Sequence, residues 1–139
     1  MAEHQHWVRE QRRQACSDIM DAYGTFILTV NRIADMIMNH VQPSDSDIPA
    51  IRIDGWRLVL AVDRVRLWGP EELATSAQGI RSEARELIAL GWQLRDAMAS
   101  PDPDALEDWL DQCTTRADAA KQARDVFTVA AYQALGDRT

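Results

Sequence analysis

The chain has 139 residues, a net charge of −7 and 46% apolar residues, a size that fits one domain. This apolar share is too high for a disordered chain, and the acidic balance argues against a nucleic-acid binder that works by overall electrostatics. We find no apolar run of about 18 residues and no basic segment preceding an apolar stretch near Met1. We therefore expect no membrane span, no signal peptide and a cytoplasmic location.

The first predicted helix runs from about Gln5 to Val41. Its first dozen residues are polar on every face, so residues 1–14 are expected to form a helical overhang beyond the packed bundle. Further along, apolar residues recur at spacings of three and four, which is typical of a helix with one buried face. These residues are Ala15, Ile19, Ala22, Tyr23, Phe26, Val30, Ile33 and Ile37.

A loop is predicted over residues 42–53, because Pro43 and Pro49 interrupt the helical pattern. The second helix is then short: Asp54 caps its start, and Gly69-Pro70 ends it. Its apolar face is expected to comprise Trp56, Val59, Val62 and Val65.

Two longer helices are predicted in the second half of the chain. The third begins after Pro70 and carries an unbroken heptad pattern of the kind found in antiparallel bundles. That pattern comprises Leu73, Ala77, Ile80, Ala84, Leu87, Gly91, Leu94 and Met98. The fourth begins after the turn Pro101-Asp102-Pro103, and its buried stripe comprises Leu106, Leu110, Cys113, Ala117, Ala120, Phe127 and Ala131. The fold class is therefore an all-α antiparallel four-helix bundle with a short second helix.

The short second helix predicts an uncovered apolar groove in one half of the bundle. At about 15 residues it would span roughly 22 Å, against about 40–48 Å for the other helices. The groove or interface would be lined by Ile33, Met36, Ile37, Leu87, Trp92, Leu94, Met98 and Trp109. Three occupants are consistent with the pattern: a non-helical lid formed by Ile48, Ile51 and Ile53, a second copy of the chain, or an apolar small molecule.

Catalytic and metal-binding patterns are not found in the sequence. Cys16 and Cys113 are expected to be reduced and far apart on antiparallel helices. Glu3 and His6 match one half of a di-iron motif, but the second pair and the further inward glutamates are missing, so we expect no metal and no cofactor. Asp63 is expected to form a structural ion pair with an arginine.

Several segments together resemble a set of small, uncharacterised actinobacterial helical-bundle proteins. The matching features are Arg12-Arg13, the helix junction Val65-Arg-Leu-Trp-Gly-Pro-Glu-Glu-Leu73 followed by Ala77, and Phe127-x-x-Ala-Ala-x-x-x-Leu-Gly136. The usual Tyr-x-x-Phe-Leu segment is altered here to Tyr23-Gly-Thr-Phe-Ile-Leu28. The resemblance implies the bundle fold and brings no activity or catalytic residue with it.

These observations lead to two functional expectations. The first is a non-enzymatic protein that acts through protein–protein interaction or self-association, with a homodimer as the expected assembly. The second is a small-molecule-binding or sensor domain that uses the apolar groove beside the second helix.

Overall fold

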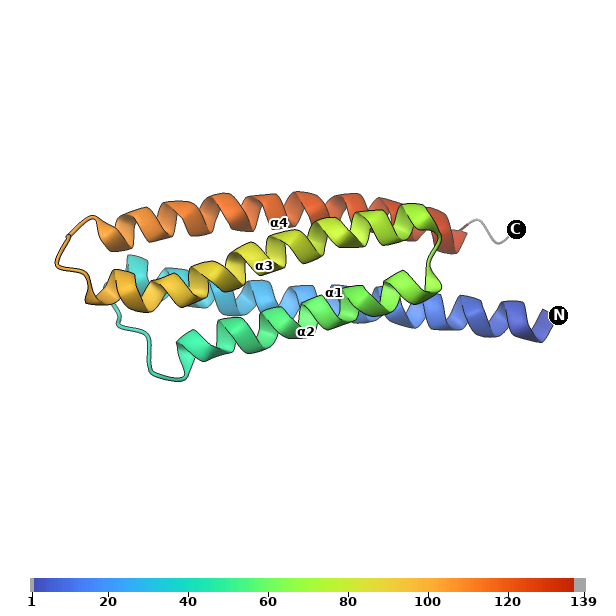
Figure 1. The fold of residues 1–139 in the computed structure, drawn as a ribbon, viewed down its shortest axis with the longest axis horizontal. Coiled ribbons are helices and arrows are strands. Elements are labelled where there is room, and N and C mark those ends of the chain that lie inside the picture. Colours follow the sequence, from blue (N-terminus) through green and yellow to red (C-terminus); the bar gives the residue numbers. More distant parts are fainter. Residues whose placement is uncertain (1, 137–139) are drawn as a thin grey trace.

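Within residues 2–136, four helices run up and down along one long axis (Figure 1). A computed structural model describes residues 2–136 and places α1 at Ala2–Met38, α2 at Asp47–Trp68, α3 at Glu71–Ala99 and α4 at Ala105–Gly136. No strand occurs within this range. Helix α3 packs against α2 and α4, while α1 packs extensively against α2 and less extensively against α4. The all-α antiparallel four-helix bundle is thus confirmed.

The heptad pattern predicted for α3 forms the centre of the core. All of its positions from Leu73 to Leu94 are buried, and Met98 at the end is half-buried. From α1, the predicted residues Ala15, Ile19, Tyr23, Phe26 and Val30 are buried as well. In α4, Cys113, Ala120, Phe127 and Ala131 face the core, with Leu106, Leu110 and Ala117 at its margin.

Helix α2 begins at Asp47, seven residues before Asp54, where the sequence predicted its start. Pro49 does not prevent this, because the first backbone bond of the helix runs from the Ala50 N–H to the Ser46 carbonyl. A proline in the first turn loses no helical hydrogen bond, since those N–H groups have no partner inside the helix. The assignment of 42–53 as a loop was wrong for residues 47–53, although α2 is still the shortest helix, with 22 residues.

Helix α1 ends at Met38 with a left-handed cap. His40 has a φ of 57°, and the Val41 N–H donates to the Met36 carbonyl at 2.7 Å. This pattern closes the last turn of α1 and directs the chain toward the start of α2.

The N-terminal turns of α1 extend beyond the α2–α3 junction (Figure 1). Residues 2–7 are exposed. The overhang is attached to the junction at two points: the Trp7 ring packs edge-on against Trp68 at 5.1 Å between centroids, and the Arg12 Nε donates to the Trp68 carbonyl at 3.0 Å. Trp7 therefore already has an aromatic partner within the chain.

Candidate functional site

The predicted groove is mostly filled by the early turns of α2. Ile51 is buried in the core and meets α3 where Gly91 leaves room for it. Ile48 is half-buried against the core, whereas Ile53 is exposed. Ile48 and Ile51 thus cover part of the bundle as residues of a helix, whereas the sequence analysis expected a non-helical lid. Ile53 takes no part in the cover.

The predicted groove residues separate into a buried group and an outer group. Three of the aliphatic residues, Ile33, Leu87 and Leu94, are core residues that no ligand reaches, and Ile37 is buried beside them with 8% of its surface exposed. Met36 lies on the outer side of α1, where the Arg32 guanidinium approaches its sulfur at 3.9 Å. What remains of the groove is a cavity of about 300 Å³ at the end of the bundle, where Ile37 and Met98 meet Pro43 and Leu106.

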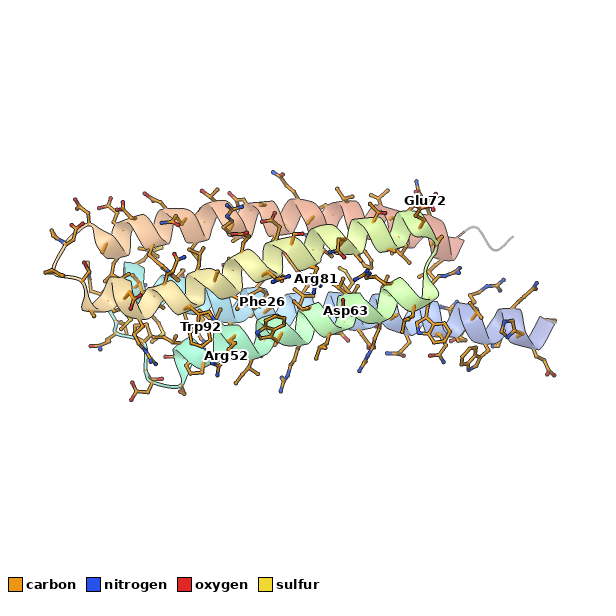
Figure 2. All side chains as sticks on the ribbon, in the orientation of Figure 1. Phe26, Arg52, Asp63, Glu72, Arg81 and Trp92 are labelled. Atoms are coloured by element: carbon orange, nitrogen blue, oxygen red, sulfur yellow. The ribbon has the colours of Figure 1, made fainter. Side chains whose placement is uncertain are left out.

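The two tryptophans that the sequence placed together have different environments. Trp109 is only 3% exposed, and its indole N–H donates to the Leu90 carbonyl at 2.7 Å. Trp92 is 58% exposed on the outer side of α3. The Arg52 guanidinium stacks over the Trp92 ring at 4.9 Å from its centroid, so the pair bridges α2 and α3 on the surface (Figure 2).

A second apolar stripe, which sequence reasoning missed, runs along the solvent face of α2. It consists of Ile53, Trp56, Leu60 and Leu67, which we call the α2 outer stripe; all four are exposed, with Leu60 at 61% and Leu67 at 76%. Their spacings of three, four and seven place them on one side of the helix. The assignment of Trp56 to the buried face was wrong, because Gly55 and Leu58 occupy that face instead.

Charged groups border the α2 outer stripe on both sides. Arg57 and Arg64 lie toward α1, and Arg64 approaches Asp18 of α1 at 3.6 Å. Arg52 and Arg66 lie toward α3. The three arginines at positions 57, 64 and 66 keep more than half of their side chains exposed.

The two carboxylates near the stripe are already engaged within the bundle. Asp54 accepts a 2.6 Å hydrogen bond from the Thr29 hydroxyl. Asp63 lies 3.5 Å from the Arg81 Nε and 3.8 Å from Arg66, across the α2–α3 face (Figure 2). This is the structural ion pair expected for Asp63. Arg57, Arg64 and Arg66 each lie within 4 Å of a carboxylate but are more exposed than that partner, so arginine is the outermost charged group on both borders of the stripe. The chain as a whole has a net charge of −7.

The start of α2 is held by a buried carboxylate. Asp47 accepts hydrogen bonds from the Arg32 guanidinium at 2.8 Å and from the Ser44 backbone N–H at 2.7 Å. The bond from Arg32, and after it the bond from Ser44, lowers the pKa of Asp47 below its ordinary value of 3.8. The contact ties α1 to the first turn of α2, close to the segment that fills the predicted groove.

Replacing Asp47 by asparagine is expected to reduce stability by about 1 kcal/mol at pH 7, with half-exposed Arg32 keeping the value small. The pKa of Asp47 is lower in the folded protein than in the unfolded chain, so its ionised carboxylate stabilises the fold fully at pH values above the unfolded-state pKa. This stabilisation is lost as the pH falls through the folded-state pKa. The unfolding free energies of wild type and variant should therefore differ above about pH 5 and converge as the pH falls through the lowered pKa of Asp47 in the folded state. Urea unfolding across this range measures the difference. Asp45→Asn is the control, since Asp45 is exposed; a pH-independent gap for Asp47→Asn would contradict the assignment.

Within residues 2–136, the structure brings together no group of histidine, cysteine and carboxylate side chains that could hold a metal ion. Cys16 and Cys113 are both free and buried, and burial raises the pKa of each thiol to about 11. None of the four helices, over their described residues, is long and apolar enough to cross a lipid bilayer.

Comparison of the chain with protein-family models, with curated protein sequences and with solved structures finds no match in any of the three.

Proposed function

We propose that this is a non-enzymatic interaction protein whose α2 outer stripe binds an acidic amphipathic helix of a partner protein. The observation that carries the proposal is the combination of four exposed apolar side chains along one helix face with arginines on both borders. From Ile53 to Leu67 the stripe extends over roughly 21 Å, or four turns, which suits a helix laid along it.

Apolar burial supplies the driving force for such an association. Exposed apolar side chains at helical spacing gain roughly 25 cal/mol per Å² when a partner removes them from water. Trp56 at the edge of the stripe is the residue type that most often anchors interfaces. Scattered surface leucines need no explanation, but an ordered row on one helix face is typical of an interaction site.

Charge argues against a second copy as the occupant. An antiparallel pairing of two α2 helices centred on Leu60 would place Arg57 of one copy beside Arg64 of the other. The opposite border would place Arg52 beside Arg66. A parallel pairing would bring Arg52 beside Arg57 of the other copy. Like charges meet in both arrangements, and they oppose association.

A partner helix with glutamate or aspartate beside its apolar residues avoids this repulsion. Each border arginine would then face a carboxylate, which accelerates association and fixes the orientation of the two helices. The proposal thus keeps the interaction function expected from the sequence and replaces the homodimer by a different chain. The expected surface has also moved, from the inner groove to the outer face of α2.

Two synthetic helices test the proposal. Both carry about three heptads of leucine at the contact positions; one has glutamate and the other lysine at the flanking positions. Fluorescence anisotropy should show that the labelled acidic helix binds and that the basic one binds at least tenfold more weakly, with an affinity that falls as salt is added. Light scattering should show that the free protein is a monomer.

Leu60→Asp and Val126→Asp form a matched pair for the same measurement. Both side chains are 61% exposed, but Val126 lies on α4, away from the stripe. Leu60→Asp should abolish binding of the acidic helix, and Val126→Asp should leave it unchanged. Failure of the acidic helix to bind the wild-type protein would refute the proposal, as would equal loss in the two variants.

A further inference from the structure

A second surface feature, which shares Arg52 with the border of the α2 outer stripe, is a cavity of about 280 Å³ between α2 and α3. It lies beside the first turns of α2, near the end of the bundle that holds the α1–α2 loop. Its lining combines apolar side chains with two arginines and one indole: Ile48, Pro49, Ile88 and Gly91 beside Arg52, Trp92 and Arg95.

The two arginines have no acidic partner. Among the arginines described between residues 2 and 136, Arg52 and Arg95 are two of the five that form no ion pair with a carboxylate; the others are Arg9, Arg12 and Arg85. Arg52 stacks on the Trp92 ring, and this contact leaves the edge of its guanidinium free to donate hydrogen bonds. In a chain of net charge −7, two uncompensated guanidinium groups that line one cavity are a local anion-attracting feature.

The rest of the lining favours an anion that also carries an apolar body. Ile88 is buried and Ile48 half-buried, so together they offer an aliphatic wall beside the core. Trp92 is 58% exposed, so its ring presents a large apolar aromatic surface to solvent. A fully hydrated inorganic anion would use only the arginines and leave this apolar surface in water.

We propose that this cavity binds a small organic acid whose flat apolar body contacts Trp92, Ile48 and Ile88 while its carboxylate is held by Arg52 and Arg95. Guanidinium groups match a carboxylate with paired hydrogen bonds. The indole adds apolar contact area and holds Arg52 in place by stacking. The site includes Trp92 and Ile48, which the sequence placed in the groove and its lid, but it lies outside the inner part of the groove, which α2 fills.

Calorimetric titration with 2-naphthoate and with neutral 2-naphthamide tests the proposal on the full chain. The acid should bind saturably with one site per chain, and the amide at least tenfold more weakly, because it lacks the charge that the arginines recognise. Inorganic phosphate should bind more weakly than 2-naphthoate, because it lacks the apolar body.

Three variants assign the interaction to the cavity. Arg95→Gln should weaken 2-naphthoate binding at least tenfold and leave binding of the amide unchanged. Trp92→Ala should weaken binding of both compounds. Arg116→Gln is the control, since Arg116 lies on α4 and pairs with Glu83, outside the cavity. Lack of saturable 2-naphthoate binding at about 5 mM, equal affinity for acid and amide, or an unaffected Arg95→Gln variant would each overturn the proposal.

This test is separable from that of the α2 outer stripe. Leu60→Asp should abolish binding of the acidic helix and leave 2-naphthoate binding intact, because Leu60 does not line the cavity. Arg95 lies on α3, outside the stripe, so Arg95→Gln should retain binding of the helix.

Discussion

Trp109→Ala is expected to lower the free energy of unfolding by about 3–5 kcal/mol, whereas Trp92→Ala should change it by about 1 kcal/mol or less. Trp109 is 3% exposed, and its loss leaves a cavity between α3 and α4 in addition to the lost transfer energy of the ring. Trp92 loses only surface contacts and its stacking with Arg52. Urea unfolding followed by helical circular dichroism measures both changes.

The Trp109→Phe variant separates the contribution of the indole hydrogen bond to stability from the contribution of the ring volume. The Leu90 carbonyl accepts the indole N–H at 2.7 Å, and phenylalanine cannot donate to it. A carbonyl has two acceptor positions, and one can remain in the helical bond, so the cost of the lost bond is about 1 kcal/mol. The smaller ring adds a partial cavity term. If Trp109→Ala cost no more than Trp92→Ala, the assignment of Trp109 to the core would be wrong.

The sequence predicted the core of α3 well because its heptad pattern permits only one buried face. Leu73 to Leu94 alternate large and small residues at strict spacing, while the rest of the helix surface is mostly polar. No other rotation of the helix would bury a comparable apolar area. The bundle topology followed from this pattern and from the tight turns on either side of α3.

Helix α2 could not be predicted equally well, because apolar residues lie on two of its faces. Val59 and Val62 face the core, while Leu60 and Leu67 face solvent. When a helix has two apolar stripes of similar length, the spacing of the apolar residues does not show which stripe is buried. The burial of one stripe depends on how closely α2 approaches α3, which is a property of packing between helices.

The start of α2 was missed for a different reason. Pro49 was interpreted as a helix breaker, although a proline at the third position of a helix costs no hydrogen bond. This one boundary created the predicted groove, because a helix that begins at Asp54 would leave half of the bundle uncovered. Because α2 begins at Asp47 and fills most of that groove, the candidate site is assigned to the outer face of α2.

Close approach of α2 and α3 depends on two glycines. Ile51 of α2 packs at Gly91 of α3, and Ile88 of α3 packs at Gly55 of α2. A Cβ added at Gly91 would lie 2.8 Å from Ile51 Cγ2 and 3.2 Å from its Cβ. One added at Gly55 would lie 2.5 Å from Ile88 Cγ1. The helices are therefore joined by a reciprocal pair of isoleucine–glycine contacts.

Gly91→Ala and Gly55→Ala are each expected to destabilise the protein by about 1–3 kcal/mol. Alanine favours a helix over glycine by about 1 kcal/mol. The added Cβ would overlap the β-branched isoleucine and force the helices apart, and the free-energy cost of this separation exceeds the gain in helix propensity. Gly24→Ala is the matched control: a Cβ there meets nothing within 4 Å. That variant should be more stable than wild type by about 0.5–1 kcal/mol.

A double-mutant cycle tests the cause of the destabilisation. Ile51→Ala removes the atoms that oppose a Cβ at position 91, so Gly91→Ala should cost at least about 1 kcal/mol less in the Ile51→Ala background than in wild type. Ile51→Ala combined with Gly24→Ala should instead be additive, because the two positions share no contact. Additivity of Gly91→Ala with Ile51→Ala would show that glycine at position 91 is not needed for the close packing of α2 against α3.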